Sequence, residues 1–315
     1  MPKQKIAMST IGILHSGTDN GKHDKEIAAF ISTLKKAGYS KPKNLTITGP
    51  LWSDDDPATL AQNAKTLADT VPRLNLIVAA GGTASTYAAQ AATKANRIPV
   101  VFTSFSQLTS PASNMTGVDA RTSELDVIRL AKLYDLVHAQ WPNQLMFGVL
   151  ENPSRKDYDH QKLDDVATRL GIQLDRKPVS PGADQTKIIN AIDQAFQSWQ
   201  QKGIKAALVA ADPLFNDLRQ DVIAAEKSYG IAAMHQWHEF KDEGGYASYG
   251  TSLTEAYEQA AVIAGQVLDG TDSIANIPVV PLTNIALSVN SKTAQRLGLK
   301  APSSPRKRTV SRRHK

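Results

Sequence analysis

The chain has 315 residues, 41% hydrophobic and 21% charged, which is typical of a soluble globular protein and unlike a disordered or fibrous one. It contains no cysteine, which excludes disulfides, thiolate metal sites and a thiol nucleophile. The net charge of +6 arises in the last ten residues, which hold six Lys or Arg and no acid. Because the rest of the chain is neutral, we expect no specific nucleic-acid partner, and we predict a disordered basic tail over residues 304–315.

The amino-terminal region does not resemble an export signal. Residues 11–14 are too few for the apolar segment of a signal peptide, which needs about 7–15 residues, and no apolar run approaches the roughly 20 residues of a membrane span. We therefore expect a cytoplasmic protein if Met1 is the true start, and a periplasmic one if an export leader is missing from this sequence.

The first hundred residues alternate between short apolar runs and amphipathic stretches. Strands are expected at residues 11–14, 44–47, 74–79 and 98–102, and helices at 25–36, after Pro57 and at 83–95, with a polar loop over 48–57. Strand, helix, strand repeated in this way predicts a doubly wound parallel sheet.

The pattern then restarts. A short segment at 114–119 precedes a helix at 123–140. Strands are expected at 145–150, 172–179, 206–210 and 231–235, and helices at 155–170, 185–200 and 214–229. This second series predicts another lobe of similar architecture. The helix expected at 254–268 and the strand expected at 285–289 are too few for a third domain, so we expect them to cross back and complete both lobes.

Ligands of open parallel sheets bind at the carboxyl ends of the strands, so polar residues there are the candidate site. The first lobe offers His15, Ser16, Gly82, Thr83, Ser85, Thr103 and Ser104, with Ser106 nearby. The second offers Asn152, Asp212 and Trp237, beside Ser154, His235 and Gln236.

Each of these candidates also has a purely structural interpretation. The helix that begins near Gly82 has free N–H groups and a positive dipole end suited to a carboxylate, but Thr83 or Ser85 would equally cap it. Asp212 is placed either to accept an ammonium group or to cap the next helix. Trp237 is placed either to stack on a planar ligand or to pack inside its lobe.

No enzymatic motif is evident. The His235-Gln-Trp-His238 segment has no metal-ligand spacing and no third ligand, so we expect neither a metal nor a cofactor. The sequence also lacks a GxGxxG after the first strand, a GxxxxGK[ST] loop and a GxSxG elbow, which leaves a dinucleotide, P-loop or hydrolase enzyme without support.

Four segments carry a resemblance to a known family. They are residues 11–17 with Leu-Lys-Lys-Ala-Gly-Tyr at 34–39, residues 76–102 ending in Ile-Pro-Val-Val-Phe, Asn-Met-Thr-Gly-Val at 114–118, and residues 244–298 from Gly-Gly-Tyr-Ala-Ser-Tyr-Gly to Leu-Gly. In this order the chain resembles the ABC-transporter substrate-binding proteins of the type I periplasmic-binding fold, in the branch of the tryptophan- and tyrosine-binding lipoproteins.

The resemblance implies two Rossmann-like lobes joined by a three-segment hinge, expected near residues 116–119, 247–250 and 282–285. Lobe 1 would comprise residues 1–118 and 248–283, and lobe 2 residues 119–247 and 284–303. It implies a monomer that closes on a small-molecule ligand, an amino acid as one possibility, and delivers it to a membrane ABC permease. A cytoplasmic ligand sensor and a small α/β enzyme remain alternatives.

Two departures from the family pattern lie at the expected cleft. The turn after the third strand reads Gly-Gly-Thr-Ala-Ser where the family has a Thr-Pro-Ala-Ala-like turn, and residues 212–215 read Asp-Pro-Leu-Phe. The ligand is therefore not transferred from the family.

Overall fold

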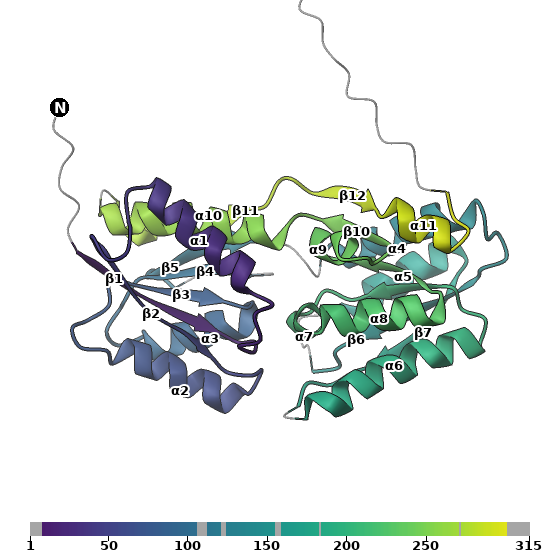
Figure 1. Ribbon diagram of the computed structural model, residues 1–315, viewed down its shortest axis with the longest axis horizontal. Helices are drawn as coiled ribbons and strands as arrows, with labels where there is room; N and C mark the ends of the chain where they lie inside the picture. The colour runs from purple at the N-terminus through teal and green to yellow at the C-terminus, as the bar shows by residue number, and fades with distance from the viewer. Residues whose placement is uncertain are drawn as a thin grey trace, which may run out of the picture.

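The computed structural model describes residues 8–105, 112–120, 124–154, 159–182, 184–270 and 272–300. It forms two lobes, each a six-stranded sheet covered by helices, with the chain crossing between them along one side (Figure 1). The predicted tail at 304–315 and Ser106 lie outside the described residues.

The first lobe is built on a parallel sheet of strand order β11-β5-β4-β3-β1-β2. The strands are β1 (Ser9–His15), β2 (Leu45–Trp52), β3 (Leu76–Ala80), β4 (Val100–Phe105), β5 (Met115–Asp119) and β11 (Val280–Pro281). Helices α1 (Asp24–Lys36) and α10 (Leu253–Asp269) pack together on one side, and α2 (Pro57–Ala68) and α3 (Thr83–Ala92) on the other. Both faces of the sheet are covered, which explains why every residue of β3 is buried.

The second lobe repeats this design with strand order β12-β10-β9-β8-β6-β7. Its strands are β6 (Met146–Glu151), β7 (Gln173–Pro178), β8 (Ala206–Val209), β9 (Ala232–His235), β10 (Ala247–Gly250) and β12 (Ala286–Val289), the last antiparallel to β10. The helices are α4 (Asp126–His138), α5 (His160–Leu170), α6 (Gln185–Gln201), α7 (Pro213–Asp217), α8 (Arg219–Tyr229), α9 (His238–Asp242) and α11 (Ser291–Arg296). The predicted α/β class with two Rossmann-like lobes is confirmed.

The chain passes between the sheets three times: after β5, after β10, and between β11 and β12, where the single-turn 3-10 helix η1 (Ile274–Asn276) precedes β11. Two of the expected hinge segments, 116–119 and 247–250, are strand residues, so the crossings begin at their ends. The expected lobe boundary between residues 247 and 248 falls inside β10, all of which belongs to the second sheet.

Two expected elements differ from the observed ones, and both differences affect the cleft. The loop expected over 48–57 is strand as far as Trp52, because Leu51 and Trp52 pair with Leu14 and His15 of β1 across a register shift. The single helix expected over 214–229 is two helices, which separate at Leu218 (φ −97°, ψ 25°). The short helix α7 thereby ends at Asp217, which faces the first lobe.

Candidate functional site

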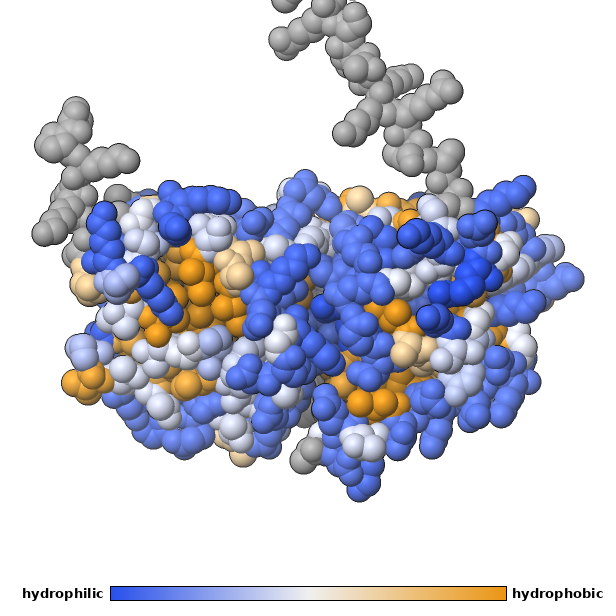
Figure 2. Space-filling model, in the orientation of Figure 1, coloured by the Kyte–Doolittle hydropathy of each residue, from blue (hydrophilic) through white to orange (hydrophobic). Residues whose placement is uncertain are grey.

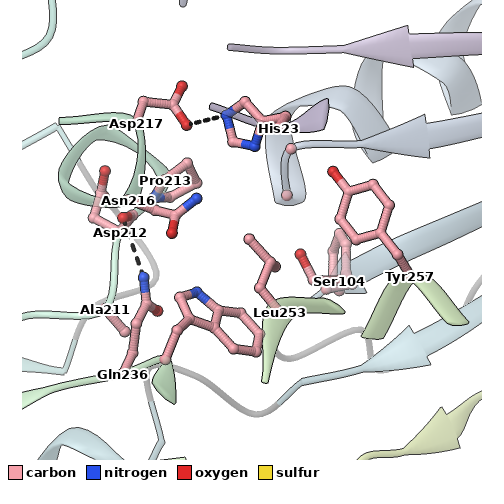
Figure 3. Close-up of a pocket in the computed structure, with 14 residues that line it drawn as sticks. His23, Ser104, Ala211, Asp212, Pro213, Asn216, Asp217, Gln236, Leu253 and Tyr257 are labelled. Carbon is pink, nitrogen blue, oxygen red and sulfur yellow. Dashed lines mark hydrogen bonds and ion pairs between the residues drawn. The ribbon is translucent and has the colours of Figure 1, made fainter. Parts of the chain in front are cut away.

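A cavity of about 50 Å³ lies between the lobes, where the carboxyl ends of both sheets meet (Figure 3). Its first-lobe lining is His23, Gly81, Gly82, Ser104, Phe105, Leu253 and Tyr257, and its second-lobe lining is Ala211, Asp212, Pro213, Asn216, Asp217, Gln236 and Trp237. Pockets for drug-sized ligands measure about 300–1,000 Å³, so the lobes are closed more tightly than a ligand of that size permits. On the face shown in Figure 2, hydrophilic side chains follow the junction of the lobes.

The first-lobe wall is rich in hydrogen-bond donors. Helix α3 begins after Gly82, whose φ of 107° and ψ of −160° lie in a region that only glycine adopts readily. No side chain caps this helix within the described part of the chain, so its first N–H groups are directed at the cleft without a side-chain acceptor. The hydroxyls of Ser104 and Tyr257 complete this wall.

The second-lobe wall is rich in acceptors. Asp212 caps α7 by accepting a hydrogen bond from the Leu214 N–H to Oδ1 at 2.9 Å. Its Oδ2 accepts one from Asn152 Nδ2 at 3.2 Å, and Gln236 Nε2 donates to its carbonyl oxygen at 3.3 Å. The buried indole of Trp237 lines the same cavity. Asp212 is thus both a helix cap and a carboxylate at the cavity.

Direct contacts hold the two walls together. Asp217 of α7 pairs with His23 across the lobes, with 2.9 Å between Oδ1 and Nε2 (Figure 3). Lys22 Nζ donates to the Asp217 carbonyl oxygen at 2.9 Å. A Cβ added to Gly82 would lie 3.0 Å from Cγ of Pro213, so a side chain at this glycine would press against the opposite lobe.

His15 and Ser16 are buried behind the first-lobe wall and are not among its lining residues. The Gly17 N–H donates to Nδ1 of His15 at 3.0 Å, which leaves the proton of the neutral ring on Nε2, 3.1 Å from the Tyr257 hydroxyl. Burial lowers the pKa of His15 well below its usual value, so the ring stays neutral. Ser16 donates from Oγ to the Gly81 carbonyl at 2.8 Å. Both residues support residues that line the cavity.

Of the other residues that the sequence proposed for the site, some line the cavity and the rest lie behind it or are buried in a lobe. Gly82, Ser104, Asp212 and Trp237 line the cavity. Ser85 and Thr103 are buried in the first lobe, Thr83 is half-buried, and Asn152 holds Asp212 from behind; none of these four is among the lining residues.

Several lining residues were not predicted from the sequence. His23 lies in the loop between β1 and α1. Its place after the end of a strand was the one feature of the sequence that could have marked it as a cleft residue. Asn216 and Asp217 were expected in the first turn of a long helix, and Tyr257 belongs to α10, to which the chain returns from the second lobe. Gln236 was visible only as a neighbour of Trp237.

Among the described residues, no group of three or more His, Asp or Glu side chains is arranged to hold a metal ion. In the same part of the chain, no helix has both the length and the apolar character that a membrane span requires.

Comparison with known proteins decides the family. A model of the ABC transporter substrate binding protein family matches residues 16–310. The chain belongs to this family. Its members are solute-binding proteins that work with an ABC permease and are typically periplasmic or extracellular, so the chain is a binding protein rather than an enzyme. A comparison with curated protein sequences gave no significant match.

Solved structures share the fold of this substrate-binding protein. A conserved domain protein from Vibrio cholerae is 20% identical, with 95% of this chain and 96% of that one covered and a TM-score of 0.77. An ABC domain from Streptococcus pneumoniae in complex with L-Trp is 21% identical, with coverage of 94% and 96% and a TM-score of 0.76. CD0873 from Clostridium difficile, a substrate-binding protein with adhesive properties in its ligand-free, open form, is 22% identical, with coverage of 94% and 97% and a TM-score of 0.63.

Proposed function

We propose that this substrate-binding protein binds a small zwitterionic solute between its lobes, an amino acid being the first class to test, and delivers it to an ABC permease. The supporting observation is the opposite chemistry of the two walls. The uncapped start of α3 with the Ser104 and Tyr257 hydroxyls suits a carboxylate, and the Asp212 carboxylate suits an ammonium group.

The apolar part of the lining favours a ligand with a planar or aromatic side chain. Trp237, Phe105, Leu253 and the ring of Tyr257 border the cavity and offer stacking surfaces. The S. pneumoniae protein of the same fold is described in complex with L-Trp, which makes L-Trp and L-Tyr sensible first probes. At about 50 Å³ the cavity is too small for either, so we expect binding to begin with the lobes further apart.

The proposal is tested by a thermal-shift screen of the natural amino acids and small carboxylates, followed by calorimetric titration of each hit. If none of these compounds raises the melting temperature, the amino-acid assignment is wrong. For a hit, we expect Asp212→Asn to weaken binding at least about tenfold, because a hydrogen bond to a charged group is worth about 1.5–3 kcal/mol. Trp237→Ala should weaken it by a similar factor.

Matched controls separate a site effect from a folding effect. Asp184→Asn makes the same change at the cap of α6, where Asp184 accepts from the Lys187 N–H at 3.2 Å, and Trp141→Ala removes a tryptophan that does not line the cavity. Both controls should bind normally. Normal binding by Asp212→Asn and Trp237→Ala as well would contradict the second-lobe assignment.

We further propose that each lobe moves as a rigid domain, with the three segments that cross between the sheets as the hinge. We also propose that the protein is a monomer and that it acts outside the cytoplasm. Static light scattering tests the monomer, and fractionation of the native host with antibody detection tests the location. Recovery of the protein in the cytosolic fraction alone would contradict delivery to a permease and favour a sensor.

A further inference from the structure

The closed lobes bring two carboxyl groups together at the mouth of the cleft. Asp55 lies in the loop between β2 and α2 of the first lobe, and Asp217 ends α7 of the second. Their side chains face each other, and both border a second cavity of about 230 Å³ beside the first. Asp217 is only 6% exposed, so one member of the pair has lost nearly all contact with water.

The backbone holds Asp55 in this position. Its N–H donates to the Ser16 carbonyl at 2.7 Å, and the Asp54 N–H donates to the Gly17 carbonyl at 3.1 Å. Asp54 and Asp55 both adopt left-handed backbone conformations, with φ of 50° and 56°, which are uncommon for residues other than glycine. The loop is therefore fastened to the end of β1 with the Asp55 carboxyl directed at the other lobe.

The two oxygens of Asp217 have different surroundings. Oδ1 pairs with His23 at 2.9 Å. Oδ2 lies against Gly17, 2.4 Å from the place where a Cβ would be, and receives no hydrogen bond from any described residue. The buried Oδ2 of Asp217 therefore has no hydrogen-bond donor among the described residues, although the Asp55 carboxyl lies nearby.

The charged and titratable groups around the pair come from both lobes. Asp55 also faces Asp212 and Asp54, and Asp217 also faces His23, Lys22 and Tyr257, while Glu26, Arg219 and Glu239 form the next layer. The basic side chains near Asp217 are thus His23 and Lys22, and Lys22 donates to the Asp217 backbone carbonyl rather than to its carboxyl. Neither provides a donor between the two carboxyl groups.

Two adjacent carboxylates repel each other, whereas one shared proton converts the contact into a strong hydrogen bond. Burial, and next the proximity of Asp217, raises the pKa of Asp55 from 3.8 to about 8 in this closed arrangement. When the lobes separate, Asp217 moves away and water reaches Asp55, so its pKa returns toward the ordinary value.

We propose that closure of the lobes takes up one proton from solvent, which is held between Asp55 and Asp217, so that the closed form is favoured at lower pH. Because the group binds its proton more tightly in the closed form, the closure equilibrium is most favourable below the open-form pKa. It falls as pH rises toward about 8, by at most about tenfold per pH unit. Above that value it is constant.

The absence of native cysteine allows a direct test without a ligand. Lys65 on α2 and Lys187 on α6 have side chains that are 66% and 84% exposed, and the two helices lie along the same edge of the molecule, one on each lobe (Figure 1). Lys65→Cys and Lys187→Cys, labelled with a fluorophore pair, report the distance between the lobes. Between pH 5.5 and 8.5 we expect the closure equilibrium to fall at least about tenfold at constant ionic strength.

Asp55→Asn is the decisive variant. Asparagine tolerates the left-handed backbone and donates a hydrogen bond to Asp217 without a charge, so we expect closure that no longer depends on pH in this range. Asp54→Asn makes the same change at the adjacent left-handed residue and should keep the pH dependence. His23→Gln should keep it as well, although closure weakens overall.

Three outcomes would overturn the proposal. One is a wild-type distance that does not change with pH. Another is a pH dependence that survives Asp55→Asn and disappears in His23→Gln, which would assign it to the His23–Asp217 pair. The third is closure at pH 8.5 on addition of MgCl2 or CaCl2 that Asp55→Asn abolishes, which would show that a metal cation rather than a proton joins the carboxyl groups.

Discussion

Replacement of Arg129 by methionine should destabilise the second lobe more than replacement of an exposed charged residue does. Arg129 on α4 pairs with Asp126 one turn earlier, at 2.6 Å, and the two side chains are 1% and 2% exposed. Arg129 Nε donates to the carbonyl oxygen of Tyr249 in β10 at 2.8 Å, and Asp126 Oδ2 accepts from the Ala211 N–H at 2.9 Å. The pair therefore joins α4 to the strand before one crossing and to the loop that carries Asp212.

The magnitude follows from burial. Removal of one member of a buried pair leaves an uncompensated charge and costs about 3–5 kcal/mol, a large part of the about 5–15 kcal/mol that stabilises a typical native protein. Lys132 and Asp135 form an exposed pair on the same helix, at 3.9 Å and with side chains 43% and 66% exposed. Lys132→Met should cost less than about 1 kcal/mol.

The assay is urea unfolding followed by tryptophan fluorescence, since three of the four tryptophans lie in the second lobe. A double variant, Asp126→Asn with Arg129→Met, removes both charges and keeps an acceptor for the Ala211 N–H, so it should be more stable than Arg129→Met alone. If Arg129→Met lowers the free energy of unfolding no more than Lys132→Met does, the Arg129–Asp126 pair does not stabilise the second lobe as inferred from the structure.

Two further predictions concern buried groups. The pKa of His15 is lowered in the folded state, so below about pH 6.5 the unfolded chain binds more protons at this residue than the folded one. The free energy of unfolding should therefore decrease as the pH decreases, by up to about 1.4 kcal/mol per pH unit. His15→Gln should show a smaller decrease between about pH 7.5 and 5.5, and an equal decrease would contradict the interpretation. Gly148→Ala places a Cβ 2.5 Å from the buried Trp199 ring and should cost about 1–3 kcal/mol in the same unfolding assay, whereas Gly182→Ala, with nothing within 4 Å of its Cβ, should stay within about 0.5 kcal/mol.

The fold was accessible from the sequence because local patterns specify it. Apolar runs such as residues 76–80, buried on both faces, and amphipathic helices such as α1 alternate with enough regularity to predict two parallel sheets. The loops at strand ends were predicted for the same reason, and Gly82 and Asp212 are found at the cavity because each begins a helix that follows a strand.

Only the tertiary structure decided which polar groups meet at the cleft. His15 ends a strand as expected but is buried behind Tyr257, which reaches the wall from a helix more than 240 residues later in the chain. Asp217 reaches His23 because the helix is interrupted at Leu218, and no periodic pattern in the sequence marks that interruption. The sequence by itself determined the alternation of strands and helices, since that depends on neighbouring residues. The contacts across the cleft depend on how the two sheets lie relative to each other, which residues far apart in the chain decide together.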